Sequence, residues 1–151
     1  LHKAVVGSDS LVRVPFILRD PTENLPKTVD KCMSNCDVFP TLTALAGIGT
    51  PPNVHGKKIF DVLEKDEEHK ALVFCNEWAH EKRNYTIYDD NYRYTWYPGY
   101  QYSELFGHRN DPEESENIAD QKPEIVERFK AEIQRRLVDY YAPILDKRGR
   151  H

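Results

Sequence analysis

The sequence predicts an α/β protein in two parts: the edge of a mostly parallel core sheet, then a small C-terminal antiparallel sheet of about four strands packed by a long C-terminal helix. Three observations predict this fold. Residues 14–18 are almost continuously apolar, as in a strand covered on both faces. Aromatic and β-branched runs separated by turn residues follow between 71 and 106. Apolar residues then recur at three- and four-residue spacing from 123 onward.

The first part is a strand that leads through a loop into a helix. The strand at 14–18 should end at Asp20-Pro21, because the residue before a proline is pushed out of helical geometry and the pair favours a turn. A helix is expected from Asp37 to Gly47, with the Asp37 carboxylate accepting from the free amides of its first turn and glycine supplying the left-handed residue that ends it. Its apolar stripe is Leu42, Leu45 and Ala46. A short apolar helical turn at 59–63 follows.

The second part has the pattern of an antiparallel meander covered by a helix. A charged stretch at 64–70 separates the two parts, so we expect one subdomain at 1–68 and another at 69–151. Tight turns join the expected strands, which are 71–75, 85–88, 92–97 and 102–106. Pro123 opens the last helix, which is expected to end before Pro143. Its stripe consists of Ile125, Phe129, Ile133, Leu137 and Tyr140.

The first part is incomplete as a parallel sheet. A parallel strand needs parallel neighbours, each delivered by a crossover connection, and only one such strand precedes the helix. The chain also begins at Leu1 without an initiator methionine. We therefore expect it to be the C-terminal piece of a larger protein.

Composition excludes some classes of function. The formal net charge of −4 argues against a nucleic-acid partner, whose phosphates favour a basic surface. No apolar run approaches the roughly 20 residues of a membrane span. The cysteines are Cys32, Cys36 and Cys75, without the spacing of a zinc or redox pair. They are either structural thiols or, in an exported protein, include a Cys32–Cys36 disulfide.

Four residues are the candidates for a site. Lys3 beside His2 precedes the buried strand, and loops next to sheet strands carry sites in α/β folds; a lysine there could hold an oxyanion. The alternative is a solvated surface lysine. Trp78 and His80 follow a strand and could line a pocket, or they could form a packed strand-end cluster.

Other polar and aromatic residues have two readings each. His108 with the carboxylates of residues 111–114 could bind a cation or form an exposed acidic loop without calcium-loop spacing. The tyrosines and Trp96 could face a carbohydrate or belong to the core. Asn84-Tyr85-Thr86 fits the glycosylation sequon, which matters in an exported eukaryotic protein. No phosphate loop, His-Glu-x-x-His pair or Gly-x-Ser-x-Gly elbow is present.

Four patches follow one another along nearly the whole chain. They are His2-Lys3 with Arg13-Val14-Pro15-Phe16-Ile17-Leu18-Arg19-Asp20-Pro21, then Asp37-Val38-Phe39-Pro40-Thr41-Leu42 with Ala46-Gly47-Ile48, then His55-Gly56-Lys57, and finally Tyr92-Arg93-Tyr94 through Glu104-Leu105-Phe106, Asn110-Asp111-Pro112-Glu113-Glu114 and Asn117-Ile118-Ala119. Taken together and in this order, they resemble the C-terminal part of a sulfatase of the alkaline-phosphatase superfamily.

The resemblance implies a hydrolase that cleaves sulfate esters of a sulfated small molecule or glycan. In that family a formylglycine, made from a Cys/Ser-x-Pro-x-Arg motif, attacks sulfur, and calcium binds the sulfate. This chain contains no such motif. The resemblance places Lys3 as the lysine that contacts the sulfate, and it places the calcium ligands outside this chain. We therefore expect the isolated chain to be inactive and to bind no calcium itself.

Two alternatives stay open. The parent protein could be one of the related phosphonate or phosphodiester hydrolases, which share the core and similar C-terminal segments. The chain could instead be a non-catalytic binding or assembly module, whose unpaired strand edge and exposed helix face favour self-association or pairing with the missing N-terminal part. Family members are often periplasmic, secreted or lysosomal, but the sequence leaves the compartment undecided.

Overall fold

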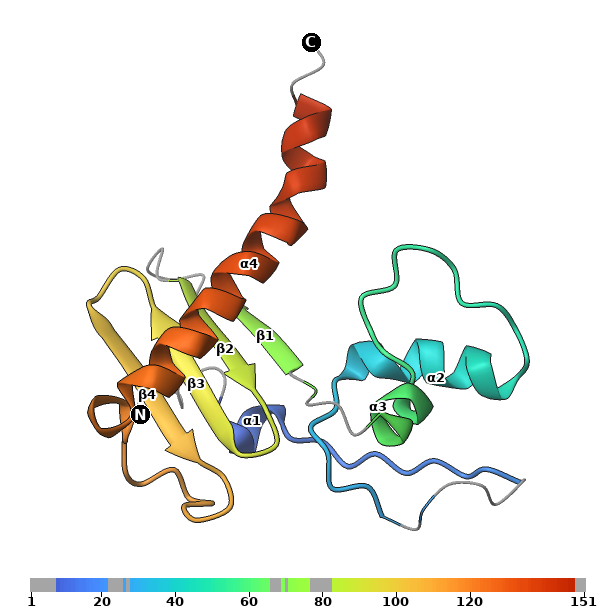
Figure 1. The fold of residues 1–151 in the computed structure, drawn as a ribbon, viewed down its shortest axis with the longest axis horizontal. Coiled ribbons are helices and arrows are strands. Elements are labelled where there is room, and N and C mark those ends of the chain that lie inside the picture. Colours follow the sequence, from blue (N-terminus) through green and yellow to red (C-terminus); the bar gives the residue numbers. More distant parts are fainter. Residues whose placement is uncertain are drawn as a thin grey trace. The chain divides into compact units, whose positions relative to one another are not determined.

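The computed structural model describes residues 8–21, 26, 28–65, 69, 71–76 and 83–148. The chain divides into two compact units. The first comprises residues 1–71 and 88–90, and the second comprises residues 72–87 and 91–151. Figure 1 shows the helices and strands of each unit.

The first unit is built from short helices. These are α1 (Asp9–Val12), η1 (Asn35–Asp37), α2 (Val38–Leu45) and α3 (Ile59–Glu64). The predicted helix is confirmed as η1 followed by α2, and Gly47 adopts the expected left-handed backbone with φ of 67°. The predicted turn at 59–63 is confirmed as α3, which buries Ile59 and Val62. The stripe of α2, in contrast, is exposed at Leu42 and Leu45.

The strand predicted at 14–18 is wrong for the structure of this chain. The segment has no regular secondary structure, and the side chain of Ile17 is 92% exposed. The physical reason is that a strand exists through its hydrogen-bonded neighbours. The sheet in the described part of the chain consists of other strands, and residues 14–18 take no place in it. Val14 and Phe16 are also exposed, so the segment presents apolar side chains to solvent.

The second unit contains the antiparallel sheet. Its strands are β1 (Ala71–Asn76), β2 (Arg83–Tyr88), β3 (Tyr92–Tyr97) and β4 (Tyr102–Gly107), and they lie side by side in chain order. This sequential order confirms the predicted meander, because short connections return the chain to the neighbouring position. Strands β3 and β4 pair antiparallel, with Tyr94 opposite Leu105 and Thr95 opposite Glu104.

Helix α4 (Pro123–Arg148) lies across one face of this sheet (Figure 1). Its predicted stripe is confirmed at four positions: Phe129 and Ile133 are fully buried in the cluster with Tyr94 and Leu105, and Ile125 and Leu137 pack against it. The side chain of Tyr140 lies outside the described part. The rings of Tyr94 and Phe129 stack with centroids 6.0 Å apart. The predicted end before Pro143 is wrong, since α4 continues to Arg148. A proline removes one donor and disfavours the helix locally, but extending an existing helix avoids the larger cost of nucleating a new one.

The outer edge of β4 is covered by the segment that precedes α4. The Leu105 amide donates to Asn117 Oδ1 at 2.9 Å, and the Leu105 carbonyl accepts from the Ile118 amide at 2.9 Å. Asn117 Nδ2 also donates to the Ser103 carbonyl at 3.1 Å. Because these groups are paired, this edge does not offer the open ladder that favours strand addition. Of the helices in the described residues, none is both long and apolar enough to cross a bilayer.

Candidate functional site

The four residues predicted for the site lie outside the described residues. His2 and Lys3 precede residue 8, and Trp78 and His80 fall between 76 and 83. Their roles therefore stay predictions. What the structure does describe is two buried polar clusters, one in each unit, and their chemistry can be worked out from their contacts.

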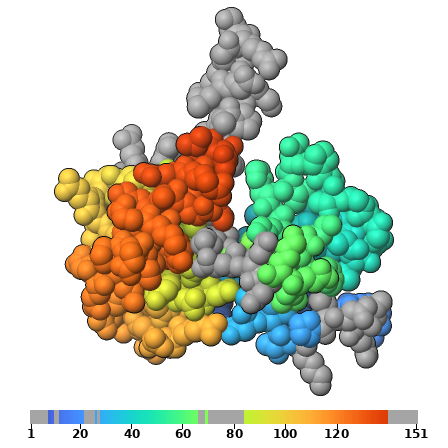
Figure 2. Space-filling model, viewed as in Figure 1, coloured from blue at the N-terminus to red at the C-terminus, as the bar shows by residue number. Residues whose placement is uncertain are grey.

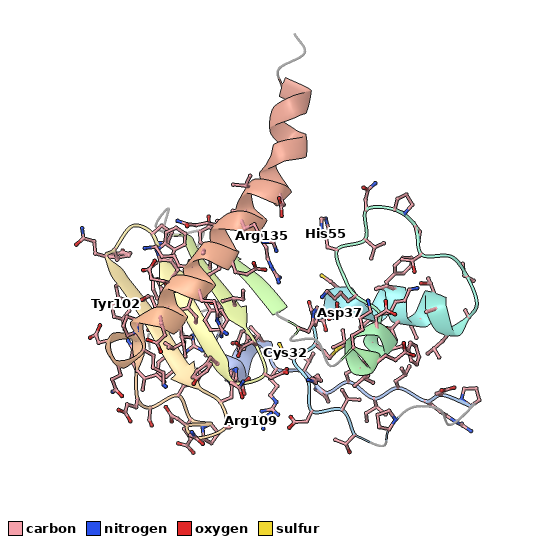
Figure 3. The ribbon with its side chains drawn as sticks, viewed as in Figure 1. Cys32, Asp37, His55, Tyr102, Arg109 and Arg135 are labelled. Atoms are coloured by element: carbon pink, nitrogen blue, oxygen red, sulfur yellow. The ribbon has the colours of Figure 1, made fainter. Side chains whose placement is uncertain are left out.

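The first cluster surrounds the Asp37 carboxylate, which is 1% exposed (Figure 3). Its Oδ2 accepts from the Ser34 amide at 2.7 Å and contacts His69 Nε2 at 2.8 Å. Its Oδ1 accepts from the Lys57 amide at 2.7 Å. The expected role of Asp37 is thus partly wrong: it accepts backbone amides, but those of Ser34 and Lys57 rather than those of α2. It joins the start of the helix to two segments distant in sequence.

Burial would raise the pKa of Asp37, but the hydrogen bonds from His69 and from the amides of Lys57 and Ser34 hold that pKa below its usual value. The packing around it is equally tight. A Cβ added to Gly56 would lie 1.9 Å from the Cys36 carbonyl oxygen, so only glycine fits. The carboxylate thus makes three hydrogen bonds to segments around it. The cluster therefore ties the parts of the first unit together.

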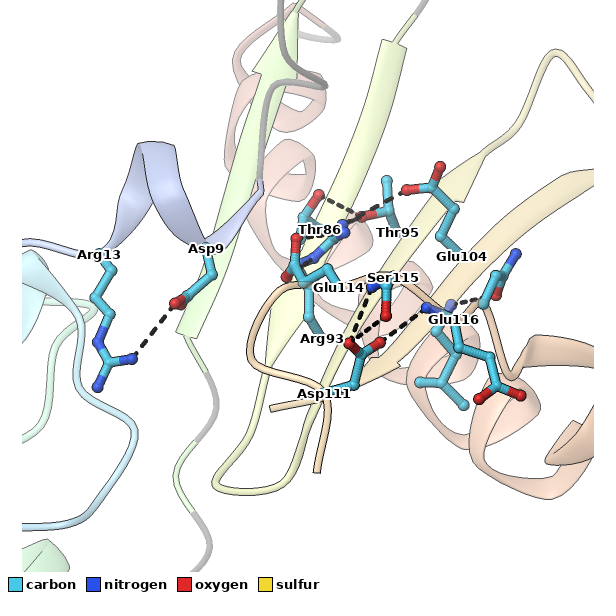
Figure 4. Close-up of polar contacts among 12 residues, drawn as sticks. Asp9, Arg13, Thr86, Arg93, Thr95, Glu104, Asp111, Glu114, Ser115 and Glu116 are labelled. Carbon is cyan, nitrogen blue, oxygen red and sulfur yellow. Dashed lines mark hydrogen bonds and ion pairs between the residues drawn. The ribbon is translucent and has the colours of Figure 1, made fainter. Parts of the chain in front are cut away.

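The second cluster surrounds Arg93, which is 2% exposed and lies on the sheet face opposite α4 (Figure 4). Its guanidinium forms a bidentate pair with Glu114, at 2.5 Å from Nε and 2.9 Å from Nη2. Nη1 donates to Thr95 Oγ1 at 2.7 Å and lies 3.6 Å from Glu104. Thr95 and Thr86 hydroxyls are 2.9 Å apart, and both residues are fully buried. This network ties the loop after β4 to the sheet.

In the acidic loop at 111–114, the Asp111 carboxylate accepts hydrogen bonds from nearby backbone and side-chain groups. Asp111 accepts from the Ser115 amide and hydroxyl at 3.0 and 2.8 Å and from the Glu116 amide at 2.9 Å (Figure 4). These bonds hold the pKa of Asp111 below its usual value. Glu114, with a φ of 53°, is committed to Arg93. The described residues contain no group of three or more His, Cys, Asp and Glu that could hold a metal ion. This part of the chain therefore provides no ligand set for the calcium ion of the sulfatase resemblance.

The remaining alternatives are decided by burial. Tyr94 and, in part, Tyr92 and Trp96 pack in the core beneath α4, whereas Tyr102 is 52% exposed. Cys32 and Cys36 are both reduced, so the structure contains no disulfide between them. In the sequon, Asn84 is 5% exposed and Thr86 fully buried within β2. Addition of a glycan to Asn84 is incompatible with this strand packing.

Sequence reasoning missed both clusters. His69 lies in the charged stretch at 64–70, yet it is 7% exposed and paired with Asp37. Arg93 stands between two tyrosines in a strand whose aromatic face was the only visible signal. The alternation of side chains along β3 places Arg93 on the face opposite the core aromatic residues, but its partner Glu114 is 21 residues away in sequence. No short-range pattern could have paired them.

Comparison with known proteins identifies the family of the chain. Residues 2–141 match the sequence profile of the family described as N-sulphoglucosamine sulphohydrolase, C-terminal. The chain belongs to this family of sulfatase C-terminal domains. The sulfatase resemblance of the sequence patches is thereby confirmed.

Individual sulfatases are also similar to this sulfatase C-terminal chain. Delta 4,5-hexuronate-2-O-sulfatase of Bacteroides thetaiotaomicron is 30% identical over 120 residues, which are 74% of this chain and 25% of that protein. Arylsulfatase K of Xenopus laevis is 26% identical over 141 residues, 84% of this chain and 26% of that protein. The chain thus spans about a quarter of the length of these curated relatives.

A solved structure shares the fold. It is described as a complex with its substrate D-glucosamine-2-N,6-O-disulfate, and its TM-score to this sulfatase C-terminal chain is 0.54 at 24% identity. The match covers 68% of this chain and 24% of that one. At this identity the likeness establishes the fold alone.

Proposed function

We propose that this chain is the C-terminal portion of a sulfatase that hydrolyses sulfate esters on a sugar, and that it works together with a further portion that carries the nucleophile and the calcium ion. The observation that carries the proposal is the family match over residues 2–141. The sugar substrate is supported by a relative that is a hexuronate-2-O-sulfatase and by a fold neighbour whose substrate is a sulfated glucosamine.

Within this function Lys3 is the residue proposed to act in catalysis. Its ammonium group would contact a sulfate oxygen and stabilise the charge that develops as the ester bond breaks. His2, Trp78 and His80 are proposed to contact the substrate, with the indole ring offering an apolar face to the sugar. The chain has no Cys/Ser-x-Pro-x-Arg motif, so the formylglycine would come from the other portion, as would the ligands of calcium.

The exposed apolar surface of the first unit supports the need for that other portion. Ile17 is 92% exposed, Ile48 is 63% exposed, and Val14 and Phe39 are both more than half exposed. Large apolar side chains that are exposed in such number are typical of a protein that packs on something else. We propose that residues 14–18 become the edge strand of a parallel core sheet when the other portion supplies a neighbouring strand.

The proposal is tested by grafting. The C-terminal quarter of the Bacteroides 2-O-sulfatase would be replaced by this chain, and hydrolysis of a 2-O-sulfated unsaturated disaccharide measured. We expect the chimera to regain turnover that the truncated enzyme lacks. We expect Lys3→Ala in the chimera to lower kcat/KM about 10²- to 10³-fold, the range found for one lost oxyanion contact. Lys65→Ala, at the exposed residue that follows α3, is the matched control.

The isolated chain provides the second test, which does not depend on the chimera folding. We expect no hydrolysis of 4-methylumbelliferyl sulfate by the purified chain. Turnover that copurifies with it would contradict the assignment of the nucleophile to another portion. Hydrolysis by the chimera of a phosphodiester or phosphonate in preference to the sulfate ester would favour the related hydrolases instead.

A further inference from the structure

The connection between β3 and β4 carries a group of tyrosines that the proposed function does not use. Tyr97 and Tyr102 are the last residue pair of the two strands before the turn, and their ring centroids lie 5.6 Å apart at 35°. Tyr100 in the turn is 41% exposed and Tyr102 is 52% exposed. Figure 2 shows this connection, in golden yellow, at the surface of the second unit, and Figure 3 shows the Tyr102 side chain at the outer side of its sheet.

Both phenols of the pair are anchored to one carboxylate. The Tyr97 hydroxyl donates to Glu104 Oε2 at 3.2 Å, and the Tyr102 hydroxyl donates to Glu104 Oε1 at 3.3 Å. Burial, together with the charge of Glu104, raises the pKa of both phenols, so they remain protonated donors. Because the Tyr97 proton is directed to the carboxylate, the Tyr97 phenolic oxygen presents acceptor lone pairs elsewhere, whereas the Tyr102 oxygen also forms a hydrogen bond with the Asn117 side chain. A bond to a charged acceptor also polarises the phenol and strengthens it as an acceptor.

The local charge selects what can bind there. Glu104 lies 3.6 Å from Arg93, whose guanidinium is already paired with Glu114. One cation between two carboxylates leaves a formal charge of −1, which disfavours a sulfate or carboxylate group at this place. Exposed aromatic faces beside hydrogen-bond acceptors suit a molecule with an apolar ring face and hydroxyl donors at its rim.

We infer that the Tyr97–Tyr100–Tyr102 surface is an accessory subsite for a neutral, hydroxyl-bearing sugar ring of the glycan. The ring stacks on the exposed tyrosine faces and donates a hydroxyl hydrogen bond to the phenolic oxygen of Tyr97. This inference rests on the proposed function, which supplies the expectation that the ligand is a sugar. It adds a contact with an unsulfated sugar unit of the same glycan. It also gives a role to the part of the aromatic surface that the core leaves exposed.

The test is an equilibrium titration of the full chain, labelled with ¹⁵N, followed by amide chemical shifts. The probe is chitotetraose, a neutral tetramer of N-acetylglucosamine. We expect shifts that cluster at residues 97–104 and saturate, and we expect Tyr102→Ala to weaken the affinity about two- to tenfold. Tyr102→Phe, which keeps the ring, should retain most of the affinity. Phe39→Ala removes a comparably exposed ring, 51% exposed, from the other unit and should change nothing.

Three results would overturn the inference: no saturable shift at residues 97–104, an affinity that Tyr102→Ala leaves unchanged, or stronger binding at the same amides by a sulfated heparin tetrasaccharide. The outcome is distinguishable from a failure of the proposed function, because the titration involves no hydrolysis. A chimera that restores sulfatase activity without shifts at this surface refutes the subsite alone. Shifts at this surface without activity in the chimera refute the sulfatase proposal and leave sugar binding intact.

Discussion

Replacing Arg93 by methionine should destabilise the second unit more than any surface substitution. The side chain is 3% exposed, and it is the cation that faces Glu114 at 2.5 Å and Glu104 at 3.6 Å. Without it, two carboxylates with side chains 11% and 14% exposed would be left together. Breaking one partner of a buried ion pair typically costs about 3–5 kcal/mol, because the remaining charge is uncompensated. We expect Arg93→Met to lie in that range.

The measurement is urea unfolding of the whole chain, with hydrogen exchange of the β3 and β4 amides reporting on the second unit. Glu114→Gln is the second single variant of a double-mutant cycle with Arg93→Met. We expect the double variant Arg93→Met/Glu114→Gln to be more stable than the sum of the single effects predicts, by about 1–3 kcal/mol. Arg93→Lys keeps the charge but not the bidentate geometry, so an intermediate loss is expected.

Glu114 offers an internal check on this reasoning. Its φ of 53° is unfavourable for a side chain and is held by the pair with Arg93. With Arg93 replaced by methionine, Glu114→Gly should therefore be more stable than Glu114→Gln, by up to about 1 kcal/mol. The reasoning is refuted if Arg93→Met costs less than about 1 kcal/mol, or if the effects of the two single substitutions simply add.

Three further predictions concern packing and acid stability. Gly56→Ala would place a Cβ 1.9 Å from a backbone oxygen and should destabilise the first unit by about 1–3 kcal/mol in thermal unfolding, whereas Gly49→Ala, with open space around its Cβ, should not. Because the pKa of Asp37 is lowered on folding, its stabilising contribution is present above pH 3.8 and is lost as the pH falls below that value. Acid unfolding of Asp37→Asn should accordingly show a weaker pH dependence over that range, and an unchanged pH dependence would contradict the assignment. Phe129→Ala should lower the free energy of unfolding by about 3–5 kcal/mol in the same urea assay, because it empties a fully buried position. Val138→Ala, at a position 67% exposed on the same helix, is the control and should change that free energy by no more than about 0.5 kcal/mol.

The elements of the second unit were predictable because their signals are local. Alternation in residues 92–97 and the turn after it are confirmed as β3 and the β3–β4 connection. The three- and four-residue spacing after Pro123 is confirmed as the buried stripe of α4. In each case one face of a single helix or strand is apolar, and the spacing of apolar residues along a few consecutive positions shows this face.

The segment at 14–18 shows where this logic ends. Its apolar run is real, yet the structure leaves Ile17 exposed and gives the segment no strand. An apolar run indicates that its side chains should be buried, but the surface that buries them belongs to another element of the fold. For the same reason the pairing of Asp37 with His69, 32 residues away, was not readable from either residue.

Ordered motifs and short-range periodicity are enough to predict the family, the meander and the covering helix. Which polar residues are structural becomes visible only in the folded chain. It committed Asp37 to His69 and Arg93 to Glu114, and it separated the core tyrosines from the exposed ones. The physical reason is that burial and charge pairing are properties of side chains brought together across long sequence separations. The local sequence pattern predicts which face of a helix or strand is buried. Which side chains contact that face depends on the tertiary fold.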